Sequence, residues 1–308
     1  MTTLVLLACL ALAADAPAKP DEALKSGDHR RTVKVGDVER TYLVHVPTKY
    51  DPTKPTPLVL CYHGGLTNGL IAIAQTGLSA KADAETFLVA YPDGTSRNGL
   101  IFVWNSGGVP SQLEEEKRDD VAFTRALIDD LAKVSNVDPK RVFATGISNG
   151  GMMCHRLAVE LSDRIAAIAP VAGTLSLEKP EPKRAVPVLQ IHGTADEIVA
   201  WNGPGPNMPK VVKFRSVDDT IKFWTQHDAC APMPNVEQLP DKSDDGTTVE
   251  RTTYGGGKQG SEVVLVKIDG GGHTWPGREL NIAILGRTTK DIAANDLIWE
   301  FFKKHPMP

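Results

Sequence analysis

A serine with a glycine two positions away on each side is the first group in this sequence that could do chemistry. Ser148 lies in "ATGISNGGMM", between Gly146 and Gly150, after the apolar run "RVFA" and before the helix-like "MMCHRLAVEL". A sharp turn from a strand into a helix holds its central residue in a strained conformation and accepts only small flanking residues. This setting predicts an exposed serine nucleophile at the start of a helix.

A serine hydroxyl becomes a useful nucleophile only when a base takes its proton and an acid holds that base. In sheet-based hydrolases the chain order is serine, acid, histidine, and each partner follows a strand. Asp196 comes just after the buried-strand run "VPVLQIHG", with Glu197 as its main rival, and His273 follows an apolar strand and three glycines in "KIDGGGHTWPG". We predict Ser148, Asp196 and His273 as nucleophile, acid and base.

Other acids and histidines fit these roles less well. Asp218 and Asp219 lie inside a helical stretch rather than after a strand. His63 and His192 each precede a glycine at a strand end, where structural histidines with satisfied hydrogen bonds are common. His155 lies about two turns into the helix that follows the serine and should point away from it.

Acyl transfer also needs two amides that receive the oxyanion, one from the residue after the nucleophile and one from the loop after an early strand. Asn149 follows the serine, and "YHGGLTNG" is the early loop. Gly65 is the expected second donor because glycine lets the backbone approach a tetrahedral intermediate closely, and Leu66 is the alternative.

Unbroken apolar runs alternate with helical stretches along most of the chain. The runs are "PLVLCYHGG", "TFLVAYPDG", "RVFATGIS", "IAAIAPVAG", "VPVLQIHG" and "EVVLVKIDGGG", and the helices are expected near 70–85, 119–134, 149–162, 216–228 and 290–304. Such runs are typical of strands buried on both faces by helices. The alternation predicts an α/β fold with one doubly wound, mostly parallel sheet, preceded by an antiparallel hairpin in "RTVKVGDVERTYLVHVP".

The N-terminus and the composition bear on location and partners. An apolar stretch over 4–13 followed by small residues predicts a signal peptide over 1–16, so that 17–308 forms a single catalytic domain exported to the extracellular space or periplasm. The chain has 34 basic and 38 acidic residues and a net charge of −4, without a basic stripe, which argues against nucleic acid as a partner. No other segment is apolar enough to span a membrane, and the chemistry requires neither metal nor cofactor.

Three cysteines belong to the mature chain, so at most one disulfide can form within it. Cys61 and Cys154 lie in apolar strand-like and helix-like runs and are expected to be buried thiols. Whether Cys230 pairs with either is left open by the sequence.

Taken together, the motifs resemble the secreted esterases of the polyhydroxybutyrate depolymerase and feruloyl (acetylxylan) esterase family, within the α/β-hydrolase superfamily. The likeness spans about 31–305 and rests on "YHGG", "YPDG", "WNSGG", "DDVAFTRALIDDLA", "GISNGGMM", "IHGTAD" and "GGGHTWPG". It implies the same triad, oxyanion donors at Gly65 and Asn149, and Trp104 and Trp275 as aromatic residues that flank the substrate.

Two departures from the family pattern affect this expectation. Many relatives pair the cysteine near "WTQHDAC" with a later one, but here the later stretch reads "TTYGGGKQG", so Cys230 lacks its expected partner. Polymer-degrading members often carry a linker and a surface-binding module that this chain does not show, which favours soluble or polysaccharide-linked esters over a solid polyester.

The resemblance ranks the candidate substrates and leaves rivals. Hydroxycinnamate esters of plant polysaccharide come first, then hydroxyalkanoate oligomers, then acetylated xylan. A peptidase of the same fold would use the same triad but usually brings a gating domain. An inactive binding protein that kept the hydrolase scaffold is the non-enzyme alternative, although binding alone would not require Ser148, Asp196 and His273 together.

Overall fold

The computed structural model describes residues 23–95, 102–108, 119–205, 212–278 and 282–308. The expected signal peptide over 1–16 lies outside these residues. The described chain forms one sheet of ten strands in the order β1-β2-β4-β3-β5-β6-β7-β10-β9-β8. The strands are β1 (Gly27–Val35), β2 (Val38–Val46), β3 (Thr56–Tyr62), β4 (Leu88–Pro92), β5 (Val137–Ile147), β6 (Ala167–Val171), β7 (Val188–Gly193), β8 (Asn235–Gln238), β9 (Thr248–Tyr254) and β10 (Val263–Asp269).

The centre of the sheet is parallel and its two edges are antiparallel. Strands β4, β3, β5, β6, β7 and β10 run in one direction as neighbours. The hairpin β1–β2 joins one side through β4, and β9 and β8 join the other side through β10. The carboxyl ends of the central strands therefore meet at one edge, where binding sites of open α/β sheets form.

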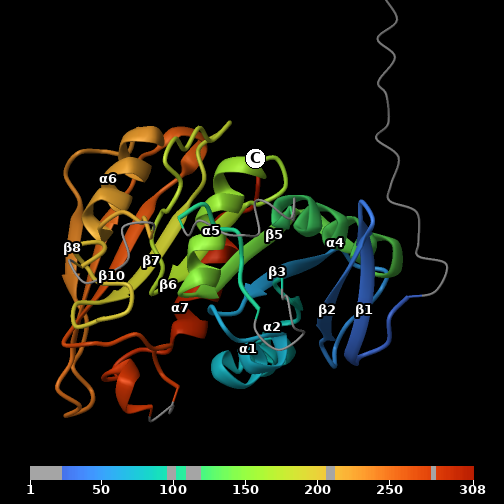
Figure 1. Ribbon diagram of the computed structural model, residues 1–308, viewed down its shortest axis with the longest axis horizontal. Coiled ribbons are helices and arrows are strands. Elements are labelled where there is room, and N and C mark those ends of the chain that lie inside the picture. Colours follow the sequence, from blue (N-terminus) through green and yellow to red (C-terminus); the bar gives the residue numbers. More distant parts are fainter. Residues whose placement is uncertain (1–22, 96–101, 109–118, 206–211, 279–281) are drawn as a thin grey trace, which may run out of the picture.

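Helices cover both faces of the sheet (Figure 1). The helices are α1 (Gly69–Thr76), α2 (Leu78–Glu85), α4 (Asp120–Val134), α5 (Asn149–Glu160), α6 (Val217–His227) and α7 (Ala294–Lys304). Buried side chains of α4, α5 and α6 share one core with Leu58, Leu60 and Tyr62 of β3. Buried side chains of α1, α2 and α7 share the other core with Val59 and Cys61, the alternate residues of the same strand.

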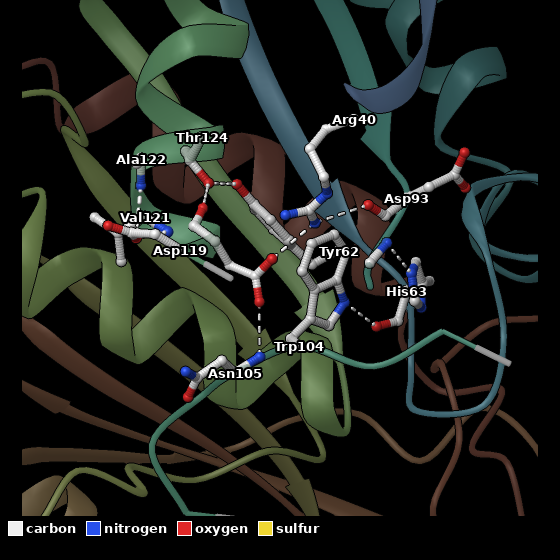
Figure 2. Close-up of polar contacts among 12 residues, drawn as sticks. Arg40, Tyr62, His63, Asp93, Trp104, Asn105, Asp119, Val121, Ala122 and Thr124 are labelled. Carbon is white, nitrogen blue, oxygen red and sulfur yellow. Dashed lines mark hydrogen bonds and ion pairs between the residues drawn. The ribbon is translucent and has the colours of Figure 1, made fainter. Parts of the chain in front are cut away.

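This two-sided burial explains why the sequence prediction of the fold class is confirmed. All seven residues of β3 and all five of β6 are buried, so neither strand shows the polar alternation of a half-exposed sheet. The predicted hairpin is confirmed as β1 and β2. Asp119 caps α4, because its carboxylate accepts hydrogen bonds from the amides of Val121 and Ala122 at 3.0 and 2.9 Å (Figure 2).

Two details differ from the sequence prediction. The helix expected over 70–85 is divided at Gly77, whose φ of 60° ends α1 in the left-handed region and begins α2. Strands β8 and β9 were not predicted because their sequences, "NVEQ" and "TVERTTY", are polar and lie at the sheet edge. Within the described ranges, no helix has the length and apolar character needed to cross a bilayer.

Candidate active site

The turn between β5 and α5 has the strained geometry predicted for Ser148. Ser148 has φ 58° and ψ −123°, its amide donates to the Val171 carbonyl of β6 at 2.9 Å, and its carbonyl accepts from the Met152 amide at 2.9 Å. A Cβ at Gly146 would lie 2.5 Å from the Tyr62 carbonyl oxygen, and one at Gly150 would lie 2.3 Å from that same oxygen. Larger residues at either glycine would push α5 away from β3, so the glycines hold the strained turn in place.

Asp196 and His273 are brought together at the ends of β7 and β10. The Nδ1–H of His273 donates to Oδ2 of Asp196 at 2.7 Å, and both side chains are buried, at 6% and 3% exposure. The other carboxylate oxygen of Asp196 accepts from the amides of Ile198 and Val199 at 2.9 and 2.8 Å. These bonds leave Nε2 of a neutral His273 with a free lone pair, as a general base requires.

The rival acids are arranged differently. Glu197, Asp218 and Asp219 are exposed, and none of them bonds to His273 in the part of the chain that the structure describes. Asp219 instead belongs to the helix cap of α6, where its amide donates to the Ser216 hydroxyl at 3.0 Å. The geometry therefore favours Asp196 among the acids that the sequence offered.

The serine and the Asp–His pair lie at the same edge of the sheet. Ser148 follows β5, whereas the pair follows β7 and β10, and β6 lies between them. Met152 of α5 packs with Val199, next to Asp196, which joins the two parts of the edge. Among the described residues no hydrogen bond joins the Ser148 hydroxyl to His273; in free enzymes such bonds are often long and tighten only with substrate bound.

The loop after β3 lies against the turn that carries Ser148. A Cβ at Gly64 would lie 3.6 Å from the Cβ of Ser148, and a Cβ at Gly65 would lie 3.6 Å from that of Asn149. Asn149 begins α5, so its amide is in the first turn, where helical amides have no acceptor within the helix. Two chain segments that could each supply an oxyanion donor are thus in contact.

His63 and Thr67 hold the Gly64 carbonyl in a fixed direction. The Thr67 hydroxyl donates to this carbonyl at 2.7 Å, and Nδ1 of His63 lies 2.7 Å from it. The Gly94 amide donates to Nε2 of His63 at 2.9 Å, so Nε2 is an acceptor and Nδ1 carries the hydrogen. Burial lowers the pKa of His63 to about 4, which keeps the ring in this neutral form at neutral pH.

The fixed Gly64 carbonyl also fixes the amide of Gly65, because the two groups belong to one planar trans peptide and point in opposite directions. The Leu66 amide, in contrast, donates to the Phe102 carbonyl at 2.8 Å. Of the two donors that the sequence left open, Leu66 is already engaged. No acceptor for the Gly65 amide occurs within the described ranges.

The side chain of Asn149 ties the segment around Trp104 to the start of α5. Its Oδ1 accepts from the Trp104 amide at 2.7 Å, and its Nδ2 donates to the Trp104 carbonyl at 3.2 Å and to the Ser106 hydroxyl at 3.1 Å. Asn105, between Trp104 and Ser106, donates its amide to the Asp120 carboxylate at 2.7 Å. The segment is therefore held from both sides.

A buried ion pair holds Asp120, the carboxylate that accepts from the Asn105 amide. Arg40 of β2 donates to Asp120 at 2.7 Å and to the Asp93 carbonyl at 3.2 Å, and the two charged side chains are 6% and 0% exposed. Figure 2 shows Arg40 reaching toward Asp93 and the Trp104 indole pointing to the backbone of His63. No local pattern in the sequence signals this pair, because Arg40 and Asp120 are 80 residues apart.

Both tryptophans that the family resemblance placed beside the substrate are buried, each at 1% exposure. The Trp104 indole donates to the His63 carbonyl at 2.9 Å and its ring meets that of Tyr62 edge-on. The Trp275 indole donates to Asn295 at 3.0 Å. These are the contacts of packing residues, so nothing in the geometry supports a substrate role for either ring.

The cysteines carry no disulfide in the described part of the chain. Cys61 and Cys154 are buried thiols, as predicted, and burial raises the pKa of Cys61 to about 12. Cys230 is partly exposed, and Gly257 occupies the space beside it, since a Cβ there would lie 3.1 Å from the Cys230 sulfur. Within the same described ranges, no three side chains of His, Cys, Asp or Glu gather as a metal site would require.

Comparisons with known proteins place the chain among esterases by similarity. A family model described as phospholipase/carboxylesterase matches residues 109–221. The chain is 32% identical over 287 residues to the "Putative esterase NocK" of Nocardia uniformis subsp. tsuyamanensis, covering 88% of this chain and 81% of that protein. It is also 32% identical to "Feruloyl esterase B" of Piromyces equi, over 76% of this chain and 42% of that protein.

Among solved structures, an acetyl xylan esterase from Aspergillus awamori aligns with a TM-score of 0.62 and 15% sequence identity, covering 90% of this chain and 99% of that chain. A likeness at this identity shows the fold alone. The expectation of an α/β-hydrolase fold, with a mixed sheet between two layers of helices, is confirmed.

The buried histidines predict how stability depends on pH. Burial lowers the pKa of both His63 and His155 to about 4, whereas a histidine in the unfolded chain has a pKa of about 6.5. Between these values the unfolded state binds more protons, so acid favours unfolding. We expect the free energy of unfolding, measured by urea denaturation, to fall by about 2 kcal/mol per such histidine between about pH 7.5 and about pH 5. His155→Gln should remove one such contribution, and the same pH dependence in this variant as in the wild type would contradict this account.

Proposed function

This chain belongs to the polyhydroxybutyrate depolymerase and feruloyl (acetylxylan) esterase family of the α/β-hydrolase superfamily, and from that premise we propose that it is a serine carboxylic ester hydrolase that works through an acyl-enzyme. The observation that carries the proposal is the strained turn of Ser148 at the sheet edge that also bears the bonded pair Asp196 and His273. Strain of this kind is retained where function needs it.

In the first half of the reaction, Oγ of Ser148 forms a bond to the ester carbonyl carbon while Nε2 of His273 takes the hydroxyl proton. Asp196 holds the ring through Nδ1 and stabilises the imidazolium. The carbon–oxygen bond to the alcohol then breaks, and His273 returns the proton to the departing alkoxide. In the second half, water attacks the acyl group in the same way and releases the acid and the free serine.

The amides of Gly65 and Asn149 are the proposed oxyanion donors. Support comes from the contact between these two residues and from the Gly64 carbonyl, which His63 and Thr67 hold so that the Gly65 amide faces the opposite way. Neither donor has to reorganise when the negative charge develops, which is the source of the rate gain in such sites.

For the substrate we propose hydroxycinnamate esters of plant cell-wall polysaccharide, and for the location an exported enzyme. Sequence similarity to a protein named feruloyl esterase supports this substrate class. Hydroxyalkanoate oligomers and acetylated xylan are the alternatives, and an inactive binding protein of the same fold is the non-enzymatic one. The buried carboxylate that orients His273 argues against mere binding, because recognition alone does not need an oriented base.

Removing the proposed nucleophile should abolish ester hydrolysis. We expect Ser148→Ala to lose turnover of p-nitrophenyl acetate and labelling by a fluorophosphonate probe, because no other oxygen can form the acyl-enzyme. Asp196→Asn should keep the fold but lower kcat by about ten thousandfold, since the amide holds the wrong histidine tautomer. Ser162→Ala, between the end of α5 and the start of β6 at the opposite edge of the sheet, serves as the control and should behave as the wild type. Retained labelling or turnover in Ser148→Ala would refute the assignment.

A matched pair of substitutions at one position tests the oxyanion donor. Gly65→Pro removes the amide hydrogen, and we expect kcat to fall about a hundred- to a thousandfold, as for other lost oxyanion donors. Gly65→Ala keeps the amide, and its Cβ would only contact Asn149 at 3.6 Å, so its kcat should stay near that of the wild type. Similar kcat values for both variants, each with an unchanged melting temperature, would exclude the Gly65 amide.

The substrate class is tested by measuring kcat/KM for methyl ferulate, 3-hydroxybutyrate oligomers and acetylated xylan under one set of conditions. We expect methyl ferulate to have the highest value, because of the sequence similarity to a protein named feruloyl esterase. The loops of the sheet edge, rather than the triad, set acyl specificity. A higher value for the oligomers or for acetylated xylan would replace the feruloyl assignment by the corresponding alternative and leave the triad untouched.

A further inference from the structure

A chain of buried polar side chains leads from helix α6 to the proposed catalytic acid, and the mechanism above does not use it. The chain consists of Trp224 of α6, His155 of α5, and Gln190 and His192 of β7. It ends beside Asp196. Each of these four side chains is at most 1% exposed. Polar groups so deeply buried are costly unless each finds a partner, so the pattern of donors and acceptors along the chain is informative.

The direction of the chain follows from its first member. The indole of Trp224 can only donate, and its Nε1 lies 3.0 Å from Nδ1 of His155. Nδ1 must therefore accept, and a neutral His155 carries its hydrogen on Nε2, which lies 3.1 Å from Oε1 of Gln190. Burial lowers the pKa of His155 to about 4, which agrees with the neutral form.

The second half of the chain continues in the same sense. With Oε1 of Gln190 accepting from His155, its Nε2 donates one hydrogen to the Gly173 carbonyl at 3.1 Å and the other to Nδ1 of His192 at 3.2 Å. Nδ1 of His192 is then an acceptor, so its hydrogen is on Nε2, 2.7 Å from the Val199 carbonyl. One donor-only indole thus determines two histidine tautomers and one amide orientation.

The chain ends beside the carboxylate that holds His273. Nε2 of His192 lies 3.5 Å from Oδ2 of Asp196, the oxygen that accepts from His273. The Val199 carbonyl that accepts from His192 belongs to the residue whose amide donates to the other oxygen of Asp196 at 2.8 Å. The Nε2–H of His192 thus donates to the turn that supplies the backbone donors, and the ring lies beside the Asp196 carboxylate.

We infer that His192 is a positioning residue for Asp196, held as the neutral Nε2–H tautomer by the Val199 carbonyl at Nε2 and by the amide of Gln190, oriented through His155 and Trp224, at Nδ1, and that this neutral ring sets the basicity of the Asp196–His273 pair. The inference rests on the proposed function, since it concerns the same acid and base. An imidazolium at His192 would compete with His273 for the Asp196 carboxylate, and the amide donor of Gln190 leaves no acceptor for the second ring hydrogen on Nδ1.

Asp196 and His273 are the titratable groups that face His192 within the described ranges, and His155 is reached through Gln190. Burial lowers the pKa of His192, with the nearby His273 acting in the same direction and Asp196 opposing it. The environment and the hydrogen-bond directions thus favour the same neutral ring.

Gln190→Glu tests the inference because it reverses one donor and leaves size unchanged. When ionised, the new carboxyl can only accept, so Nδ1 of His192 takes up a proton from solvent, and because Nε2–H still donates to the Val199 carbonyl the ring becomes an imidazolium next to Asp196. The positive charge should lower the pKa of His273 and weaken its hold by Asp196. Gln190→Met is the matched control, because it removes the polar atoms while the Val199 carbonyl still requires the Nε2–H form of His192.

The main readout is nitrogen NMR of histidine-labelled protein, which reports the protonation of each ring nitrogen and does not need activity. We expect His192 to be the neutral Nε2–H form in the wild type and in Gln190→Met, and doubly protonated at neutral pH in Gln190→Glu. The titration midpoint of His273 should move down by about half a pH unit or more only in Gln190→Glu. The acid limb of kcat/KM should move to lower pH by the same amount.

Three results would overturn the inference. One is an Nδ1–H or imidazolium form of His192 in the folded wild type near pH 7. Another is an unchanged His273 titration in Gln190→Glu. The third is an equal shift in Gln190→Met, which would indicate a packing effect only. If the wild type hydrolysed no ester, the proposed function would fail, whereas the NMR titrations would still decide how His192 acts on Asp196 and His273.

Discussion

The close approach of helix α5 to strand β3 is the constraint on which the rest of the site depends. The Tyr62 carbonyl lies where side chains at Gly146 and Gly150 would have to be, so the chain can turn from β5 into α5 only with glycine at both positions. The same approach places Ser148 in a strained conformation and the Gly64–Gly65 loop against it. A wider turn would lose the strain and the neighbouring loop together.

Neutral histidines and a donor-only indole organise the polar groups around this edge. His63 accepts from Gly94 and donates to the Gly64 carbonyl, and His192 accepts from Gln190 and donates to Val199. Each ring uses both nitrogens on backbone or amide partners, which a protonated ring could not do. Burial maintains the neutral form and so keeps the loop after β3 and the turn after β7 in single arrangements.

The two halves of the site rest on different supports. The loop after β3 and the segment around Trp104 depend on the buried pair of Arg40 and Asp120 and on the side chain of Asn149. The Asp196 turn depends instead on its own backbone amides and on the chain from α6. Because these supports share no residue, damage to one is not expected to pass directly to the other.

The sequence by itself determined the class of fold and the candidate triad, because strands buried on both faces leave unbroken apolar runs and because Ser148, Asp196 and His273 each follow such a run. Only the tertiary structure decided what depends on contacts between distant segments. The Leu66 amide is engaged by Phe102, and both tryptophans are buried. His192 lies beside Asp196 and is joined through Gln190 to His155, whose partner Trp224 is 69 residues away in sequence. Hydrogen-bond partners across such separations are set by packing, which leaves no periodic signal in the sequence.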